Sequence, residues 1–293
     1  MNTILILGCG YVGRALAASE RAQGNRVLAV TRNGTMAAQL RTEGVEVCVG
    51  NVHENGWHAF ATDVDWAVNC VSAAAPDLEG YRISYVEGNR SLVEWIAGNR
   101  FKGRAIYTSS VSVYPDSGGE WVDESNARPS SERSQILLES EQVFLQAPAG
   151  GAKTVLRLGG IYGPGRSFLA DRIAKAEGAL PGYGDYYLNL IRLEDIVGAI
   201  GAVLRSKENR DEVYSLVDDT PLLRKDLVAD LAKAMKLPVP SFDPSITRGR
   251  GSRRLGGERP ANRRISNGHF KESFGWRPQF PSALEGMVDL VSS

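Results

Sequence analysis

Residues 5–13 read LILGCGYVG and place a short apolar run directly before a glycine loop. Gly8, Gly10 and Gly13 have the G-x-G-x-x-G spacing, and a helical pattern of apolar residues follows them. The first glycine permits a tight turn, the second lets a ligand approach the backbone, and the third lets the helix pack closely on the strand. This order is typical of a loop that holds a dinucleotide pyrophosphate at the positive end of a helix. We therefore expect the loop residues to bind such a cofactor, namely Gly8, Gly10, Tyr11, Val12 and Gly13.

The composition is that of a globular chain, with 43% hydrophobic and 23% charged residues among 293. This length predicts one large α/β domain, or such a domain with a smaller appendage. Lys plus Arg equals Asp plus Glu at 34 each, so we expect neither nucleic acid nor a membrane as a partner. Cys9, Cys48 and Cys70 are odd in number and lack metal-ligand spacing. They favour reduced thiols in the cytoplasm and no metal site.

The first half of the chain alternates strand and helix patterns. We expect strands over residues 26–31, 45–49, 66–71 and 104–109, with helices over 11–23, 35–43 and 78–98. This period predicts a doubly wound parallel sheet covered on both faces. Ligands of such sheets bind beyond the carboxyl ends of the strands, so the chemistry should lie where these strands end.

The end of the second strand carries Thr31 and Arg32, where a dinucleotide fold normally has an acidic residue that holds the adenosine ribose. A carboxylate would repel a 2′-phosphate, whereas a guanidinium can donate charge-assisted hydrogen bonds to it. We therefore expect NADP(H) in preference to NAD(H). The alternative is that Arg32 is a solvated loop charge.

Several motifs along the chain together resemble one family. They are LGCGYVG at 7–13, GNV at 50–52, TSSVSVY at 108–114, LRLGGIYGPGR at 156–166, IRLEDIVGAI at 191–200 and FGWRPQF at 274–280. In this order they are similar to the extended short-chain dehydrogenase/reductase superfamily, also called the NAD-dependent epimerase/dehydratase family. The likeness covers nearly the whole chain.

The resemblance implies a seven-stranded NAD(P)-binding Rossmann core and a smaller substrate-side lobe. We expect the core over residues 1–165 and 188–217, and the lobe over 166–187 and 218–293. By the same resemblance Asn51 would read the adenine and Val52 would pack beside it, and Ser72 and Ala73 would pass beneath a cofactor ribose. Ser110 matches the family's active-site hydroxyl, which hydrogen-bonds the substrate oxygen. The family commonly forms homodimers, here through helices near 83–96 and 136–145.

The family's catalytic Y-x-x-x-K pair is missing. Its two members would share one face of the next helix, where the lysine cation lowers the tyrosine pKa for proton exchange with the substrate oxygen. The matching positions are Arg133 and Leu137, and no tyrosine in the chain is followed four residues later by lysine. Arg133 cannot act as a base near neutral pH, although it could polarise an oxygen. Other candidate acids are the tyrosines at 114, 162, 183, 186 and 187.

Two functional hypotheses therefore stay open. One is an NAD(P)-dependent oxidoreductase or epimerase/dehydratase that acts on a small metabolite such as a nucleotide sugar, with Ser110, Tyr114 and Arg133 as candidate catalytic residues. The other is a sensor of the same fold that binds cofactor without turnover.

The second half of the chain offers further features. Residues 182–189 read GYGDYYLN and are typical of a pocket wall, and helix 168–177 precedes them. Residues 247–264 carry seven arginines and no aromatic residue, which suits a solvated loop or a diphosphate clamp better than RNA. The five tryptophans are expected to pack in the core or the lobe.

Overall fold

The computed structural model describes residues 1–148, 151–207, 210–246 and 259–292. A seven-stranded sheet in the order β12-β7-β5-β4-β1-β2-β3 forms its centre. The ladders of β1 with β2 and β4, of β2 with β3, and of β4 with β5 are parallel. The strands are β1 (Thr3–Leu7), β2 (Arg26–Thr31), β3 (Glu46–Val49), β4 (Trp66–Asn69), β5 (Arg104–Ser110), β7 (Lys153–Leu158) and β12 (Glu212–Leu216). The predicted doubly wound α/β fold is confirmed.

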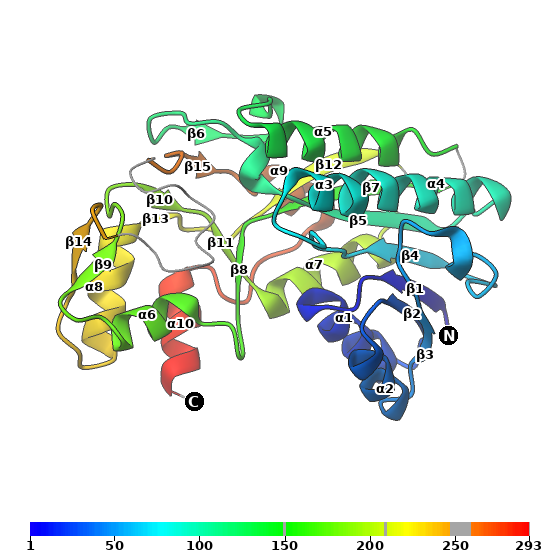
Figure 1. Ribbon diagram of the computed structural model, residues 1–293, viewed down its shortest axis with the longest axis horizontal. Coiled ribbons are helices and arrows are strands. Elements are labelled where there is room, and N and C mark those ends of the chain that lie inside the picture. Colours follow the sequence, from blue (N-terminus) through cyan, green and yellow to red (C-terminus); the bar gives the residue numbers. More distant parts are fainter. Residues whose placement is uncertain (149–150, 208–209, 247–258, 293) are drawn as a thin grey trace. The chain divides into compact units, whose positions relative to one another are not determined.

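Helices cover both faces of this sheet, with α4 and α5 on one side and α1, α2 and α7 on the other (Figure 1). They are α1 (Tyr11–Ala22), α2 (Gly34–Thr42), α3 (Leu78–Tyr81), α4 (Gly88–Gly98), α5 (Glu132–Leu145) and α7 (Leu193–Arg205). The predicted helix 78–98 is present, but Arg82–Glu87 within it wind as a π-helix. Short 3₁₀ turns occupy Asn55–Trp57, Val111–Val113 and Glu124–Asn126.

The apolar faces of α4 and α5 pack with strand residues of the sheet in one buried cluster. It includes strand residues such as Leu5, Leu28 and Tyr107, and helix residues such as Leu92 and Phe144, all buried. Burying each such side chain contributes about 1.5–3 kcal/mol. Each strand lies where its apolar residues are buried in this core. The carboxyl ends of the strands then form the edge of the sheet where ligands of such folds bind.

The chain divides into two compact units. Unit 1 holds residues 1–113, 128–157 and 197–214, and unit 2 holds 114–127, 158–196 and 215–293. Unit 2 has a core of its own, in which Leu227, Leu231 and Met287 pack with Leu180. Compared with the lobe expected from the sequence, unit 2 also takes in 114–127, 158–165, 188–196 and 215–217.

Unit 2 is built from short strand pairs and helices. The pairs are β15–β6, β11–β8, β14–β9 and β10–β13. Their bounds are β6 (Trp121–Val122), β8 (Gly160–Tyr162), β9 (Ala179–Pro181), β10 (Tyr187–Leu188), β11 (Leu190–Arg192), β13 (Leu222–Leu223), β14 (Ser241–Asp243) and β15 (Arg264–Ile265). The helices are α6 (Phe168–Ala174), α8 (Arg224–Ala234), α9 (Gly268–Phe274) and α10 (Ala283–Ser292).

One expectation for unit 2 was wrong. Helix α6 ends at Ala174 instead of 177, because the chain turns at Gly178, which has φ +89°, and then pairs Ala179–Pro181 with β14. Trp121 packs within unit 2 but is 53% exposed, with the Arg264 guanidinium 5.2 Å from its ring centroid. In the described part of the chain, no helix has both the length and the apolar content to cross a bilayer.

Candidate functional site

The glycine loop joins β1 to α1, as the sequence predicts, and its three glycines have different surroundings. A Cβ on Gly8 would lie 2.8 Å from the Val71 backbone, and Gly8 has φ +86°. A Cβ on Gly13 would clash with the Gly8 carbonyl oxygen, whereas a Cβ on Gly10 would meet no atom within 4 Å. Gly8 and Gly13 are thus required by close packing within the protein. The space beside Gly10 is open for a ligand.

The N-terminus of α1 is suited to an anion. Its N-cap residue is Gly10, no side chain caps it, and no acidic residue lies in its first turn. The first amides of a helix carry partial positive charge and need partners from outside the helix. Tyr11, Val12 and Gly13 supply those first amides. The loop can therefore hold phosphate groups with backbone donors.

Arg32 follows β2 and is exposed, as a phosphate-binding residue would be. Its guanidinium donates to the Ala74 carbonyl oxygen at 3.3 Å. The next residue, Asn33, caps α2 by accepting a hydrogen bond from the Met36 amide at 3.0 Å. Arg32 thus lies beside the start of a second helix.

Two further predicted cofactor segments follow β3 and β4. The Asn51 side-chain amide donates to Glu54 at 2.9 Å, and Val52 packs against the core of unit 1. Ser72 is exposed, and the Ala73 amide donates to the Tyr85 hydroxyl at 3.1 Å. The close approach of Gly8 to Val71 shows that the loop after β4 lies directly against the glycine loop.

The candidate catalytic hydroxyls differ in accessibility. Ser110 ends β5 and is partly exposed, and its hydroxyl oxygen accepts a hydrogen bond from the Ser112 amide at 3.2 Å. Tyr114 is only 1% exposed, and its hydroxyl lies 2.6 Å from that of Ser215. Ser110 is thus open to a ligand, whereas Tyr114 is enclosed.

Arg133 lies in the first turn of α5. Its guanidinium donates to the Pro76 carbonyl oxygen at 2.7 Å and lies over the Tyr81 ring, 5.1 Å from the centroid. Leu137, one turn further, is 2% exposed and packs in the core. The face that would carry a lysine is therefore apolar.

A buried ionic cluster lies deeper along α5, and the sequence reasoning did not identify it. Glu141 forms an ion pair with Arg157 at 2.8 Å and accepts a hydrogen bond from the Ser109 hydroxyl at 2.6 Å. The side chains of Glu141 and Arg157 are only 4% and 6% exposed. Ser109 immediately precedes Ser110. The signal in the sequence is a carboxylate between the buried residues Leu137 and Phe144 of α5.

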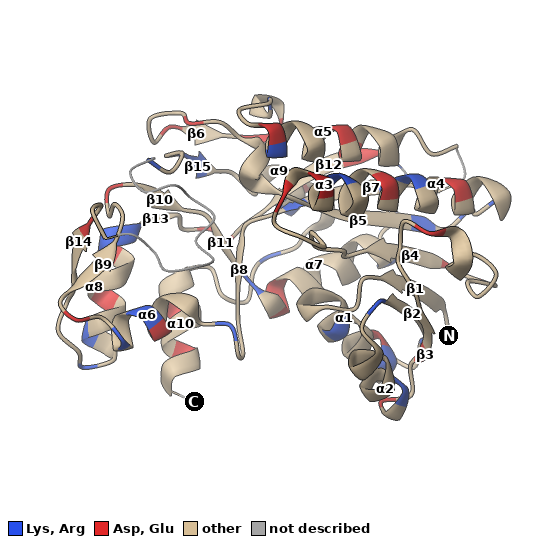
Figure 2. Cartoon of the chain, in the orientation of Figure 1, with Lys and Arg blue, Asp and Glu red and all other residues tan. Residues whose placement is uncertain are grey.

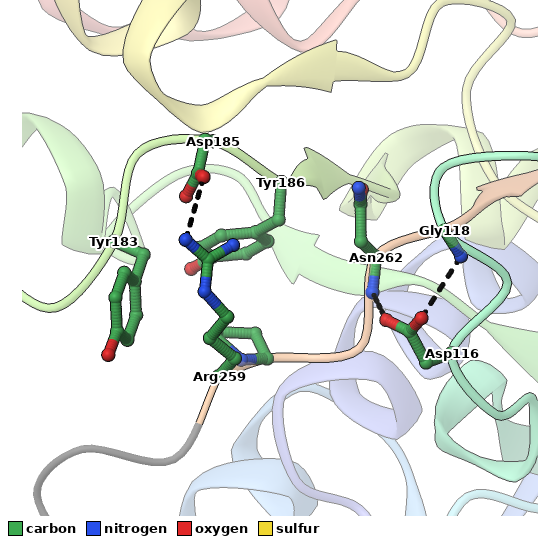
Figure 3. Close-up of a pocket in the computed structure, with 8 residues that line it drawn as sticks. Asp116, Gly118, Tyr183, Asp185, Tyr186, Arg259 and Asn262 are labelled. Carbon is green, nitrogen blue, oxygen red and sulfur yellow. Dashed lines mark hydrogen bonds and ion pairs between the residues drawn. The ribbon is translucent and has the colours of Figure 1, made fainter.

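A pocket of about 210 Å³ lies in unit 2 (Figure 3). Two tyrosine rings and a guanidinium line it with carboxylate, amide and backbone groups; its residues are Asp116, Gly118, Tyr183, Asp185, Tyr186, Arg259, Pro260 and Asn262. The pocket wall expected at residues 182–189 is thus present.

The charged side chains that line this pocket interact with neighbouring groups of the pocket. Arg259 forms an ion pair with Asp185 at 3.0 Å and lies over the Tyr183 ring, 4.6 Å from the centroid. Hydrogen bonds from the Asn262 and Gly118 amides lower the pKa of Asp116. Of the arginine-rich run, residues 247–258 lie outside the described residues.

The comparisons with known proteins agree with this geometry. A sequence model of the NAD dependent epimerase/dehydratase family matches residues 4–216, so the chain belongs to this family. Protein YeeZ of Escherichia coli strain K12 is 29% identical over 266 residues, which are 86% of this chain and 90% of YeeZ.

Two more distant similarities also span nearly the whole chain. The 3-diazoavenalumate denitrifying reductase of a Streptomyces species is 24% identical, covering 97% of this chain and 98% of the reductase. The structure of MoeE5 in complex with UDP-glucose and NAD matches with a TM-score of 0.79 and 19% identity, over 99% of this chain and 98% of MoeE5. This structural likeness shows a shared fold.

Proposed function

We propose that the chain binds a nicotinamide dinucleotide at the glycine loop and uses it in oxidoreductase or epimerase/dehydratase chemistry on a small polar metabolite. The observation that carries this proposal is the cradle at Gly10, where a side chain would meet no protein atom beside the uncapped start of α1. Family membership and the NAD bound by MoeE5 support the same cofactor class.

When bound, the dinucleotide supplies or accepts a hydride, and the chain's own groups prepare the substrate oxygen. Ser110 would hydrogen-bond that oxygen. The Arg133 guanidinium would polarise it, because a permanently charged donor stabilises developing negative charge. Tyr114 remains a candidate acid only if its side chain leaves its enclosed position.

The pocket of unit 2 supports a proposal for the substrate class. The tyrosine rings can stack on a ligand ring. The Arg259 guanidinium can bind a phosphate group when its ion pair with Asp185 is replaced by one with the ligand. These groups suit a polar molecule that bears both a ring and a phosphate, as UDP-glucose in MoeE5 does. The substrate would thus be a nucleotide sugar or a related phosphorylated compound.

We expect NADP(H) to bind more tightly than NAD(H), because Arg32 is exposed beside the N-terminus of α2. Titration calorimetry with both reduced cofactors tests this. Arg32→Ala should weaken NADPH binding by roughly ten- to a hundredfold and NADH binding much less. Arg41→Ala, at the other end of α2, is the matched control. Equal affinity of the wild type for both cofactors would contradict the preference.

Turnover is tested by mixing the protein with NADPH or NAD and a panel of carbonyl compounds and sugar nucleotides. Nicotinamide absorbance reports net oxidoreduction, and product analysis reports redox-neutral reactions. Ser110→Ala should lower the rate by about a hundredfold, with Ser112→Ala as the control. Tight cofactor binding without turnover of any compound would contradict the catalytic proposal.

A sensor that binds cofactor without turnover is the second candidate, and one observation favours it. Leu137 is buried where the family has its catalytic cation, and Arg133 is engaged with Pro76. In that case the response to cofactor would be conformational. A change in hydrogen exchange upon NADPH binding, in the absence of turnover, would support this candidate.

The assembly and partners are proposed on similar grounds. Basic and acidic residues both occur on α4 and α5 (Figure 2). Arg82, in the π-helix before α4, pairs with Glu139 of α5, and Arg90 of α4 pairs with Glu87. Such mixed charge favours a protein partner over nucleic acid. We therefore expect a homodimer through α4 and α5, which sedimentation of the wild type and an Arg82→Glu variant would test.

A further inference from the structure

The loop between β4 and α3, residues 70–77, is held by side chains that reach it from several elements. The Ala74 amide donates to the Ser84 hydroxyl at 2.8 Å, and the Ala73 amide donates to the Tyr85 hydroxyl at 3.1 Å. From inside the sheet, the Asn69 side chain accepts a hydrogen bond from the Val71 amide at 3.2 Å. Three parts of the loop backbone are thus bound by side chains.

The carbonyl groups of the same loop are bound as well. Arg32, at the end of β2, donates to Ala74, and Arg133, at the start of α5, donates to Pro76. These are the two arginines that the sequence singled out for a cofactor phosphate and for catalysis. The loop between β4 and α3 therefore connects both ends of the proposed cofactor site.

The π-helix explains how the adjacent residues Ser84 and Tyr85 can both hydrogen-bond the same loop. In a regular α-helix, adjacent side chains do not face the same way. A π-helix bonds residue i to i+5 and so has more residues in each turn, which brings adjacent side chains closer in direction. Ser84 and Tyr85 both lie in the π-helix Arg82–Glu87, and both reach the loop. Single π turns within α-helices occur frequently at functional sites.

We propose that Tyr85 is a positioning residue that fixes the loop between β4 and α3 for the cofactor through its hydroxyl. The inference rests on the proposed function, because the loop matters for binding only if a dinucleotide occupies the glycine loop. The loop lies against that site, since Val71 packs on Gly8. Tyr85 keeps its ring in place by an edge contact with Tyr81, with centroids 5.3 Å apart. Its hydroxyl accepts a hydrogen bond from the Ala73 amide and so fixes the position of the loop backbone at Ala73.

The experiment removes only the hydroxyl. Tyr85→Phe keeps the ring and its contact with Tyr81, and it should weaken binding of the tighter reduced dinucleotide by roughly three- to tenfold. Hydrogen exchange of residues 70–77 in the free protein should become faster, while exchange of β1, β2 and β5 stays unchanged. Tyr81→Phe is the matched control, one turn earlier on the same helix, and should alter neither measurement. Ser84→Ala should act like Tyr85→Phe on exchange.

The outcomes separate this inference from the proposed function. A wild type that binds no nicotinamide dinucleotide overturns the proposed function, and this inference with it. A wild type that binds, together with an unchanged affinity of Tyr85→Phe, overturns the positioning role alone. Uniformly faster exchange over the whole chain would also overturn it, because that result indicates a general loss of stability.

Discussion

The first turns of α1 and α5 both lie in unit 1, and they differ in whether side chains cap their backbone amides. Helix α1 begins at Tyr11, its N-cap residue is Gly10, and no side chain caps it. Helix α5 begins with a capping box, in which the Ser131 hydroxyl accepts from the Ser134 amide and the Ser134 hydroxyl accepts from the Ser131 amide. The first turn of α5 is thus capped by its own side chains, whereas no side chain caps the first turn of α1.

The difference extends along both helices. In α1, an exposed glycine leaves room at the site. In α5, Arg133 is bound to Pro76, Leu137 is buried, and Glu141 is bound to Arg157. The space beside Gly10 is therefore open, whereas Arg133, Leu137 and Glu141 of α5 are engaged in contacts within unit 1. Four measurements test this contrast, and their expected effects decrease in turn.

The largest effect is expected at Glu141. Glu141→Gln should lower the free energy of unfolding by about 3–5 kcal/mol, because it leaves Arg157 charged and buried without its partner. Urea denaturation measures this loss. Glu46→Gln, in the half-exposed pair with Arg26, is the control and should cost less than about 1 kcal/mol. An equal loss of unfolding free energy in the two variants would show that the buried ion pair of Glu141 contributes no more to stability than an exposed one.

Restoring the family lysine should also destabilise the protein. Leu137→Lys places an ammonium group where the side chain is 2% exposed, and we expect a loss of about 2–4 kcal/mol in unfolding free energy. Leu137→Met keeps the volume and should cost less than about 1.5 kcal/mol. If Leu137→Lys is as stable as Leu137→Met, the face of α5 is more open than its packing indicates.

The third measurement separates binding from stability at the start of α1. Gly10→Ala should weaken dinucleotide binding at least about tenfold, because its Cβ enters the space proposed for the pyrophosphate. Its unfolding free energy should change by less than about 0.5 kcal/mol, since that Cβ meets no protein atom. Gly56→Ala, which is equally unhindered, serves as the control. Unchanged affinity in Gly10→Ala would remove the cradle from the site.

The fourth measurement concerns Arg133. Arg133→Met should change the unfolding free energy by no more than about 1 kcal/mol, because the lost groups are one hydrogen bond and one ring contact. Turnover, once a substrate is found, should fall far more than stability. Arg128→Met, nearby and exposed, controls for the loss of surface charge. An equal rate in both variants would exclude Arg133 from the reaction.

The sequence predicted the core of unit 1 well because its signals are local. Strand β2 was expected over the same residues that the structure shows, and the alternation of strands and helices set the class of fold. The π-helix was missed because its apolar spacing differs little from that of an α-helix over six residues. The exposure of Trp121 was missed because it depends on Arg264, which is distant in sequence.

The amino-acid sequence by itself determined the glycine loop, the parallel sheet and the absence of a Y-x-x-x-K pair, since each depends on residues a few positions apart. Only the tertiary structure decided that Arg32 and Arg133 both bind the loop between β4 and α3, and that Tyr85 reaches Ala73. These contacts join residues that are 12 to 57 positions apart. Their partners are backbone groups, which every residue type carries, so side-chain identity in the sequence could not reveal them.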